Sequence, residues 1–594
     1  MLAIASGQNG DGPAVFAEEF ARCREELWAL AEREDVREAV WLSNPAVYAN
    51  DLGSTRRFDP SVRPSWIKRR ERTLYSYLQR FAMKNDTTSF FGPLNYGVFG
   101  PPELRLSASR IRARRTFVAC QRVARLAELA GTAPIPGSAV DPLTMLMESL
   151  RDRDDHWRSD VDTLASLADE FASTPWPARM RALDKAERHY AAITGETAGG
   201  GGDGRMFRDR ALVYEECAGD VEHVALPNVA DALVPALELF TAYAALRRDD
   251  LRARARELVA SLGGPVPLAR FVSAWRRRFP QPPPTPSADA LAAALTELVR
   301  ERTAGDVAEL SAAEVRALLP DVPDAVVASP DVMIAAADLD ALRRGDYQVV
   351  LGEVHHGIQP AGWMLTMTDP HTTDDWASEL AAHVPPGTAN VVFGRRMKVA
   401  PPEFPGPSVE ISGTAAAERV IRPADLVVHV DGTLRADGEQ VVLRAPSHGV
   451  PAGYAVFECF SSPIVAAPPL RLGARTPRVL IDGVVVQRRR WEVPSADVPR
   501  RPGTSFDLMS DFAALRARHD LQERAFVRSP AEPKPVYADF ACVFALDLLA
   551  SLARRCDVLR FEEVLPGPGE LWLRRADGTY CTEVRTVMSR GERR

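Results

Sequence analysis

Residues 80–93 read Arg80-Phe81-Ala82-Met83-Lys84-Asn85-Asp86-Thr87-Thr88-Ser89-Phe90-Phe91-Gly92-Pro93. Apolar residues recur every three or four positions before and within this stretch, and this spacing predicts a helix over residues 67–84. Arg80 and Lys84 are four residues apart, so both cations lie on one face of that helix. The polar turn and Gly92-Pro93 end the helix and leave Asp86 and Thr87 where their side chains can reach a ligand. The sequence therefore predicts that this stretch binds an anion.

The same residues also fit a purely structural interpretation. Arg80 and Lys84 would complement the helix dipole near its C-terminal end, a stabilisation of about 0.3–1 kcal/mol each. Asp86 and Thr87 would then satisfy backbone amides of the turn. Taken alone, the residues leave both interpretations open.

The stretch resembles the signature of the lantibiotic dehydratase N-terminal domain, in a form that reads Lys-Asn-Asp-Thr followed by Phe-Phe-Gly-Pro. Four further blocks follow the order and spacing of that family. They are residues 339–355 ending in Leu351-Gly352-Glu353-Val354-His355, residues 423–428, residues 477–493 with Pro477-Arg478-Val479, and residues 562–573 beginning Glu562-Glu563-Val564. The resemblance runs from about Glu19 to Arg585.

The resemblance implies an enzyme that uses aminoacyl-tRNA to modify a ribosomally synthesised precursor peptide. The first expectation is transfer of glutamate from charged tRNA to Ser or Thr, without elimination, because the chain stops at Arg594 where the elimination domain of the family would begin. A second is an ATP- and aminoacyl-tRNA-dependent ligase that adds an amino acid to a peptide C-terminus. A third is a non-catalytic scaffold of the same family that binds tRNA, peptide or partner.

The resemblance also implies cofactors and partners. No cofactor would be tightly bound; charged tRNA would be the co-substrate, and ATP would be needed only by a ligase. The expected partners are aminoacyl-tRNA, the precursor peptide, a separate eliminase, a separate leader-binding protein and a second copy of the chain.

Two groups of site residues follow from the resemblance. Arg80, Lys84, Asp86 and Thr87 would bind and orient the terminal adenosine phosphates or the aminoacyl carbonyl region, where positioning and oxyanion stabilisation supply the catalysis. Arg478, at a predicted strand start in the second half, would bind substrate as well.

Residues 210–220 form another candidate substrate-binding block, in which Arg210, Glu215 and Asp220 would hold an amino group or handle protons. Pairing of Glu215 and Asp220 with Arg210 is the structural alternative. The block departs from the family pattern at Ala211, Glu216 and Gly219.

Composition and cysteine content predict a cytoplasmic protein. Of 594 residues, 46% are hydrophobic and 26% charged, as in ordinary globular chains. The seven cysteines form no Cys-x-x-Cys pair, which argues against a disulfide framework and a structural zinc site. Residues 1–12 lack a basic region leading into an apolar stretch, and we expect no apolar window long enough to span a membrane.

Arginine clusters offer two interpretations. They lie at residues 69–72, 110–115, 276–278, 395–398 and 488–490. They would either converge into a patch that follows a phosphate backbone or form solvated surface. The net charge of −7 lacks the basic excess that dedicated nucleic-acid-binding proteins show.

Metal and nucleotide motifs are not supported. Glu353 and His355 alternate on one face of a predicted strand, but no spacing rule supplies a further ligand, so we predict no metal site. The glycine run at residues 198–204 lacks the Gly-Lys-Ser/Thr of a phosphate loop and is predicted, like the proline run at residues 280–286, to be a connector.

The apolar periodicity changes once along the chain. Helical spacing dominates to about Arg302, and short strand-like runs separated by Gly, Pro and Asp-Gly turns dominate from about Val332. This predicts an α+β fold with a helical N-terminal half and a mixed, mostly antiparallel, β-rich second half, similar to lantibiotic dehydratases. The predicted regions are 1–134 with the signature, 135–330 mainly helical, and 331–594 β-rich.

Overall fold

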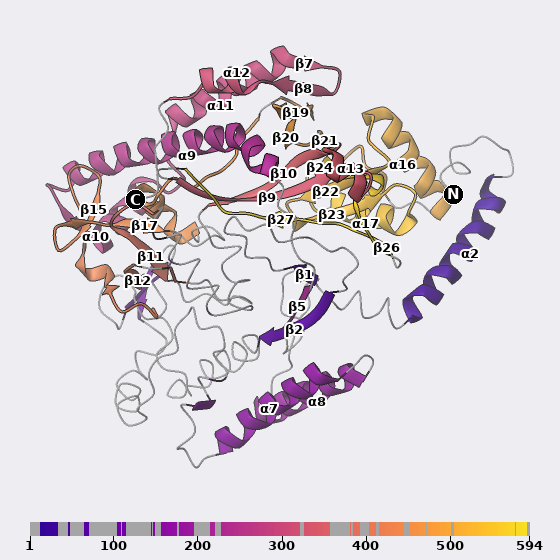
Figure 1. The fold of residues 1–594 in the computed structure, drawn as a ribbon, viewed down its shortest axis with the longest axis horizontal. Helices are drawn as coiled ribbons and strands as arrows, with labels where there is room; N and C mark the ends of the chain where they lie inside the picture. Colours follow the sequence, from indigo (N-terminus) through magenta and orange to yellow (C-terminus); the bar gives the residue numbers. More distant parts are fainter. Residues whose placement is uncertain are drawn as a thin grey trace.

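The structure is a computed structural model (Figure 1). It describes residues 12–33, 45–47, 64–70, 104–107, 110–113, 144, 147–148, 156–174, 178–194, 214–219, 227–320, 326–356, 381, 384–392, 403–404, 406–410, 415–444, 452–470, 472–500, 504–575 and 578–590.

A central eight-stranded sheet organises the described part of the chain. Its strand order is β27-β9-β10-β20-β19-β8-β7, with β28 also paired to β9. The strands are β7 (Thr303–Ala304), β8 (Val307–Leu310), β9 (Val326–Ala335), β10 (Gln348–His356), β19 (Arg478–Ile481), β20 (Val484–Gln487), β27 (Val584–Arg585) and β28 (Met588–Arg590). Segments more than 250 residues apart in sequence therefore share one sheet, and β9 crosses the boundary predicted at residue 330.

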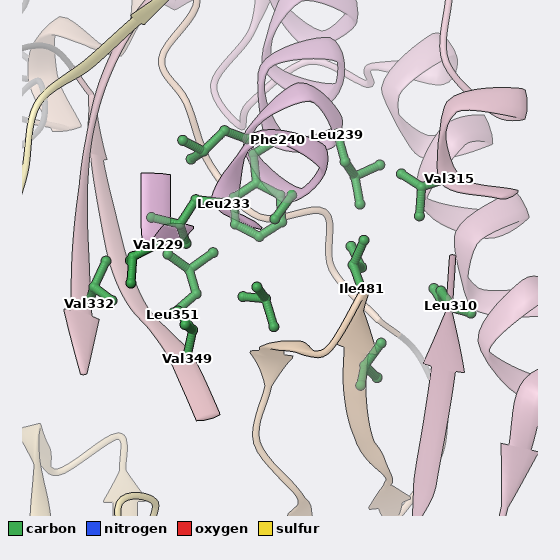
Figure 2. Packing of buried hydrophobic residues seen from close by; sticks show 14 of the residues in the cluster. Val229, Leu233, Leu239, Phe240, Leu310, Val315, Val332, Val349, Leu351 and Ile481 are labelled. Atoms are coloured by element: carbon green, nitrogen blue, oxygen red, sulfur yellow. The ribbon is translucent and has the colours of Figure 1, made fainter. Parts of the chain in front are cut away.

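The long helix α9 (Pro227–Ser261) connects two hydrophobic cores. Residues of its first half pack with α11 (Pro286–Arg302) on one face of the central sheet. Figure 2 shows Leu233 and Phe240 of α9 close to Leu351 of β10. Leu251, Ala255 and other residues of its second half belong to a separate core. Burial of these apolar faces, rather than helix propensity, holds so long a helix in place.

The prediction that no apolar window could span a membrane was wrong for α9. Among the described residues, one helix segment, Asn228–Ser261, is long and apolar enough, with a window of mean hydropathy 1.5. Two thirds of that window (67%) is buried inside the protein. The packing of its first half against the central sheet accounts for this apolar window.

The second half of α9 packs against two small sheets. One is parallel and has the order β13-β12-β11-β17; the other is antiparallel and has the order β16-β15-β14-β6. The parallel strands are β11 (Thr388–Val392), β12 (Ser408–Glu410), β13 (Val420–Ile421) and β17 (Val442–Arg444). The antiparallel strands are β6 (Val266–Pro267), β14 (Leu426–Val428), β15 (Leu434–Ala436) and β16 (Glu439–Gln440), with α10 (Leu268–Arg278) and the 3-10 helix η3 (Ala452–Phe460) completing the core.

A five-stranded antiparallel sheet forms a third core with three helices. Its order is β18-β21-β24-β22-β23. The strands are β18 (Arg475–Thr476), β21 (Arg490–Pro494), β22 (Arg524–Ser529), β23 (Glu532–Asp539) and β24 (Val558–Glu563), and the helices are α2 (Gly12–Glu32), α16 (Ser505–His519) and α17 (Val543–Ala553). Phe16 of α2 stacks edge-on against Phe506 of α16, with ring centroids 5.5 Å apart, so an N-terminal helix completes a core built from the C-terminal end.

Helices α12 (Ala312–Ala317) and α13 (Leu339–Arg344) and the hairpin of β25 (Leu573–Arg575) and β26 (Gly578–Tyr580) add residues to the core under the first half of α9. Smaller groups of elements are also present in the described part of the chain. Helices α7 (His156–Ser173) and α8 (Ala178–Thr194) pack side by side as a pair (Figure 1). A three-stranded sheet joins β1 (Pro45–Val47), β5 (Tyr214–Gly219) and β2 (Pro64–Arg70), and β3 (Leu104–Ser107) pairs with β4 (Arg110–Ala113).

The structure confirms the α+β prediction, with helices prevailing earlier and mostly antiparallel strand pairs later. The helix predicted over residues 67–84 is wrong at its start, because residues 67–70 belong to β2. Antiparallel pairing with β5 overrides the helical spacing there. The rest of that predicted helix, and the glycine run, lie outside the described residues. The proline run at residues 280–286 connects α10 to α11, as predicted.

Candidate functional site

Most of the predicted site residues lie outside the described residues. These are Arg80, Lys84, Asp86, Thr87, Arg210 and Asp220. The backbone of Glu215 lies in β5, opposite Arg69 of β2. Arg478 is the one predicted site residue whose side chain the structure describes, so the predicted grouping of these residues stays a prediction.

Arg478 begins β19 and binds the buried carboxylate of Glu563, which ends β24. Arg478 Nε donates to Glu563 Oε2 at 3.0 Å, and its Nη2 donates to Oε1. Arg489, between β20 and β21, donates to the same Oε1 from Nε at 3.0 Å and from Nη2 at 2.6 Å. A single carboxylate therefore joins the central sheet to the five-stranded sheet.

The electrostatics of this group favour an ionised Glu563. Its side chain is only 2% exposed, and those of Arg478 and Arg489 are 23% exposed. Burial raises the pKa of the Glu563 carboxyl, but the hydrogen bonds from Arg478 and Arg489 outweigh burial and bring that pKa below its usual value. Asp306 adds a second anion, 3.2 Å from Arg489 Nη1. The guanidinium group of Arg478 is therefore already paired with the Glu563 carboxylate.

The arginine run at residues 488–490 points its side chains into the protein. Arg488 donates to the carbonyl oxygen of Leu565 from Nε at 3.0 Å and from Nη2 at 2.8 Å. Arg490 Nη2 donates to the carbonyl of Leu470 and to Thr476 Oγ1, each at 3.2 Å. Arg489 binds Glu563, so all three arginines of this run contact groups of the protein where the central sheet meets the five-stranded sheet. By contrast, Arg277 and Arg278 in the last turn of α10 are exposed.

The central sheet has one face that packs against α9 and one that points away from it; we call the latter the second face. A second polar group lies on this second face. Alternate residues of β9 lie on it: Val327, Ser329, Asp331, Met333 and Ala335. Asp331 is 3% exposed, and its Oδ2 lies 3.0 Å from Nε2 of His355 in β10. An imidazole anchored to a buried carboxylate has a fixed orientation, which is what proton transfer requires of a general base.

A β-bulge sets the geometry of this pair. The register of β10 against β9 shifts between Leu351 and Val354, so Gly352 and Glu353 together oppose Asp331. The shift places His355 opposite Ser329 on the second face, and Glu353 is exposed; the expectation that Glu353 and His355 share one face stays a prediction. Among the described residues, no group of three or more His, Cys, Asp or Glu side chains could hold a metal ion.

We expect Gly352→Ala to destabilise the protein by about 1–3 kcal/mol. A Cβ atom at Gly352 would lie 3.0 Å from the carbonyl oxygen and 3.4 Å from Cβ of Asp331, so β9 would have to move. Urea unfolding measures the loss. Gly569→Ala is the matched control, because a Cβ atom there meets nothing within 4 Å. Equal unfolding midpoints for the two variants would contradict the close approach at the bulge.

No role for Glu563 or Asp331 was predicted from the sequence. Both carried a signal that could have found them: each is an acidic residue in or at the end of an apolar strand, where an unpaired charge is costly. Glu563 also lies within residues 562–573, one of the blocks that carry the resemblance.

Comparisons with known proteins agree with the arrangement of these sheets. No family model and no curated protein matches the sequence. Among solved structures, the glutamylation domain TbtB from thiomuracin biosynthesis is 19% identical, with a TM-score of 0.54, covering 92% of this chain and 76% of that one. TbtB bound to 5'-phosphodesmethylglutamycin matches over the same shares with a TM-score of 0.55. The tRNA-dependent lantibiotic dehydratase MibB from Microbispora sp. 107891 is 16% identical, with a TM-score of 0.60, covering 86% of this chain and 60% of that one. The chain has the lantibiotic dehydratase fold.

In this lantibiotic dehydratase fold, blocks that are separate in sequence meet in space. The block with Pro477-Arg478-Val479 and the block with Glu562-Glu563-Val564 join through the ion pair of Arg478 and Glu563. The block ending at His355 forms the bulge and contacts Asp331 of the neighbouring strand. Two of these blocks therefore hold the central sheet and the five-stranded sheet together, and the third shapes the second face of the central sheet.

Proposed function

We propose that the protein transfers glutamate from charged tRNA to Ser or Thr side chains of a ribosomally synthesised precursor peptide. The observation that carries the proposal is the likeness to a glutamylation domain over 92% of the chain. A second solved structure of that domain holds 5'-phosphodesmethylglutamycin, a ligand whose name specifies a 5'-phosphate. The signature at residues 80–93 supplies the cations that a phosphate needs.

The proposed chemistry is an ester exchange. The hydroxyl oxygen of Ser or Thr forms a bond to the glutamyl carbonyl carbon, and the bond from that carbon to the ribose oxygen of tRNA breaks. The hydroxyl proton ends on the ribose oxygen. One ester replaces another, so the reaction needs neither ATP nor a bound cofactor. Catalysis then consists of holding the two reactants together and stabilising the tetrahedral oxyanion.

In this proposal Arg80 and Lys84 bind the phosphates or the aminoacyl carbonyl region, and Asp86 and Thr87 orient them. Arg478 has a different assignment, because its guanidinium group is bound to Glu563. We assign Arg478 a structural role, in which it positions β19 and links the central sheet to the five-stranded sheet. Charged tRNA is made in the cytoplasm, so the proposal places the protein there.

Intact-mass spectrometry of candidate precursor peptides tests the proposal. The peptides are incubated with the full chain and total charged tRNA, with and without ATP. The expected product carries the mass of one glutamyl residue on Ser or Thr and forms without ATP. A residue added to the peptide C-terminus only with ATP would identify a ligase, because a free carboxylate must be activated before it forms an amide.

Absence of any adduct, combined with binding of charged tRNA or peptide in a filter assay, would contradict transfer and favour a scaffold. The matched control is the same incubation with tRNA stripped of its amino acids. An adduct that persists there would show that the added group does not come from tRNA.

A further inference from the structure

The small parallel sheet carries a polar row on one face. Arg444 of β17 pairs in register with Asn390 of β11, which pairs in register with Ser408 of β12. These three residues therefore lie side by side on the same face of the sheet. The opposite face is apolar, and its Val391 and Leu443 belong to the core under α9.

Arg444 is a buried cation without an anionic partner among the described residues. It is 8% exposed. Its Nη1 donates to Asn390 Oδ1 at 3.2 Å, and its guanidinium carbon lies 5.3 Å from the ring centroid of Phe404. A guanidinium group has five N–H donors, and among the described residues one neutral acceptor, Asn390 Oδ1, binds this one. Burying a charge in this way is unfavourable unless an opposite charge offsets it.

Glu403, which binds Ser408 of the polar row, has other partners. Glu403 accepts from Ser408 Oγ at 2.7 Å, from the backbone amide of Ala416 at 2.8 Å and from that of Ala417 at 3.2 Å. Burial lowers the pKa of Arg444 to about 10, and no charged neighbour in the described part of the chain opposes that change. At neutral pH Arg444 is still protonated, so its positive charge remains uncompensated in this part of the chain.

Arg444 lies where the small parallel sheet meets the central sheet. It is the last residue of β17, and its row crosses the middle of β11 and the first residue of β12. Phe404, beside Arg444, also packs against Val327 of β9 and Val587, so the polar face of the small sheet meets the second face of the central sheet.

We infer that Arg444, with Asn390 and Phe404 beside it, forms a binding site for the oxyanion group of a small-molecule or nucleotide ligand, either a carboxylate or a phosphate. Two oxygens of either group match the paired N–H donors of a guanidinium fork. Phe404 and Asn390 hold the fork in place. The inference does not depend on glutamyl transfer, since it rests on the burial and partners of Arg444.

Isothermal titration calorimetry on the full chain tests the site without tRNA or peptide. The probes are sodium glutamate, inorganic phosphate and adenosine 5'-phosphate, each with sodium chloride adjusted to constant ionic strength. The expected result is saturable binding of at least one probe, weakened about tenfold or more in Arg444→Met. Binding of glutamate alone would identify a carboxylate site, and binding of phosphate or adenosine 5'-phosphate would identify a phosphate site.

Arg419→Met is the matched control in the same part of the fold. Its side chain is 62% exposed and pairs with exposed Glu439, so its loss should leave binding unchanged. Arg444→Lys keeps the positive charge but loses the guanidinium fork, so it should fold like wild type and bind the probe more weakly. It replaces Arg444→Met in the test if Arg444→Met does not fold. No saturable binding of any probe to the wild type, or equal affinity in wild type and the Arg444 variant, would overturn the site. Neither result bears on glutamyl transfer, which has its own assay.

Discussion

Glu563→Gln is expected to destabilise the protein by roughly 3–5 kcal/mol, the usual cost of removing one member of a buried ion pair. The glutamine amide has no charge to balance the guanidinium groups of Arg478 and Arg489, which both bind the carboxylate. Asp306 remains 3.2 Å from Arg489, but it is half exposed and pairs with Arg489 rather than with Arg478. Thermal and urea unfolding at pH 7 measure the loss.

Glu562→Gln is the matched control, because it changes the preceding residue of β24 in the same way. Glu562 pairs with Arg528, whose side chain is 49% exposed, so its loss should cost about 1 kcal/mol or less. Equal unfolding midpoints for the two variants would contradict the role of Glu563 as the link between the sheets.

The difference between wild type and Glu563→Gln should also depend on pH. The folded-state pKa of Glu563 is below its usual value, so its charge stabilises the fold fully above the unfolded-state pKa of about 4.3. That stabilisation is lost as pH falls through the lower, folded-state pKa. Unfolding midpoints measured from pH 7 downward should therefore converge in acid, and a gap that stays constant would contradict an ionised Glu563.

Periodicity in the sequence predicted the fold class because most elements follow their local patterns. The helical spacing before Arg302 corresponds to helices such as α2, α9 and α11, and the strand-like runs after Val332 correspond to strands such as β10, β14, β19 and β20. Residues 67–70 differ because strand pairing with distant β5 outweighs local spacing. The order of strands could not be predicted from spacing, since it brings β8, β9, β19 and β27 together across the whole chain.

The candidate sites were less predictable than the fold. Arg478 was identified as important, but its partner Glu563 lies 85 residues further along the chain, and no local pattern pairs them. The bulge at Gly352 shifts the phase of β10 relative to β9, and the alternation of apolar residues in the sequence does not predict such a shift. Arg444 is unremarkable in sequence, and only the structure reveals that it is buried beside an amide and an aromatic ring.

The double variant Arg80→Ala, Lys84→Ala is expected to lower glutamyl transfer by about 100-fold or more while changing stability little. Removing even one preorganised group that stabilises developing negative charge commonly costs that much in rate. Transfer is followed by intact mass under single-turnover conditions. Binding of charged tRNA, measured at several salt concentrations, supplies a second readout. Loss of two phosphate contacts to single-stranded RNA should reduce the slope of log affinity against log salt by roughly 1.4.

The matched control removes one arginine and one lysine from exposed helix surfaces, as Arg343→Ala, Lys185→Ala. Their side chains are 67% and 51% exposed and form only surface ion pairs, so transfer and the salt slope should stay as in wild type. The structural interpretation of Arg80 and Lys84 predicts the opposite pattern. If they only complement a helix dipole, their loss costs up to about 1 kcal/mol each. A lower melting temperature with unchanged transfer and an unchanged salt slope would then remove both residues from the proposed site.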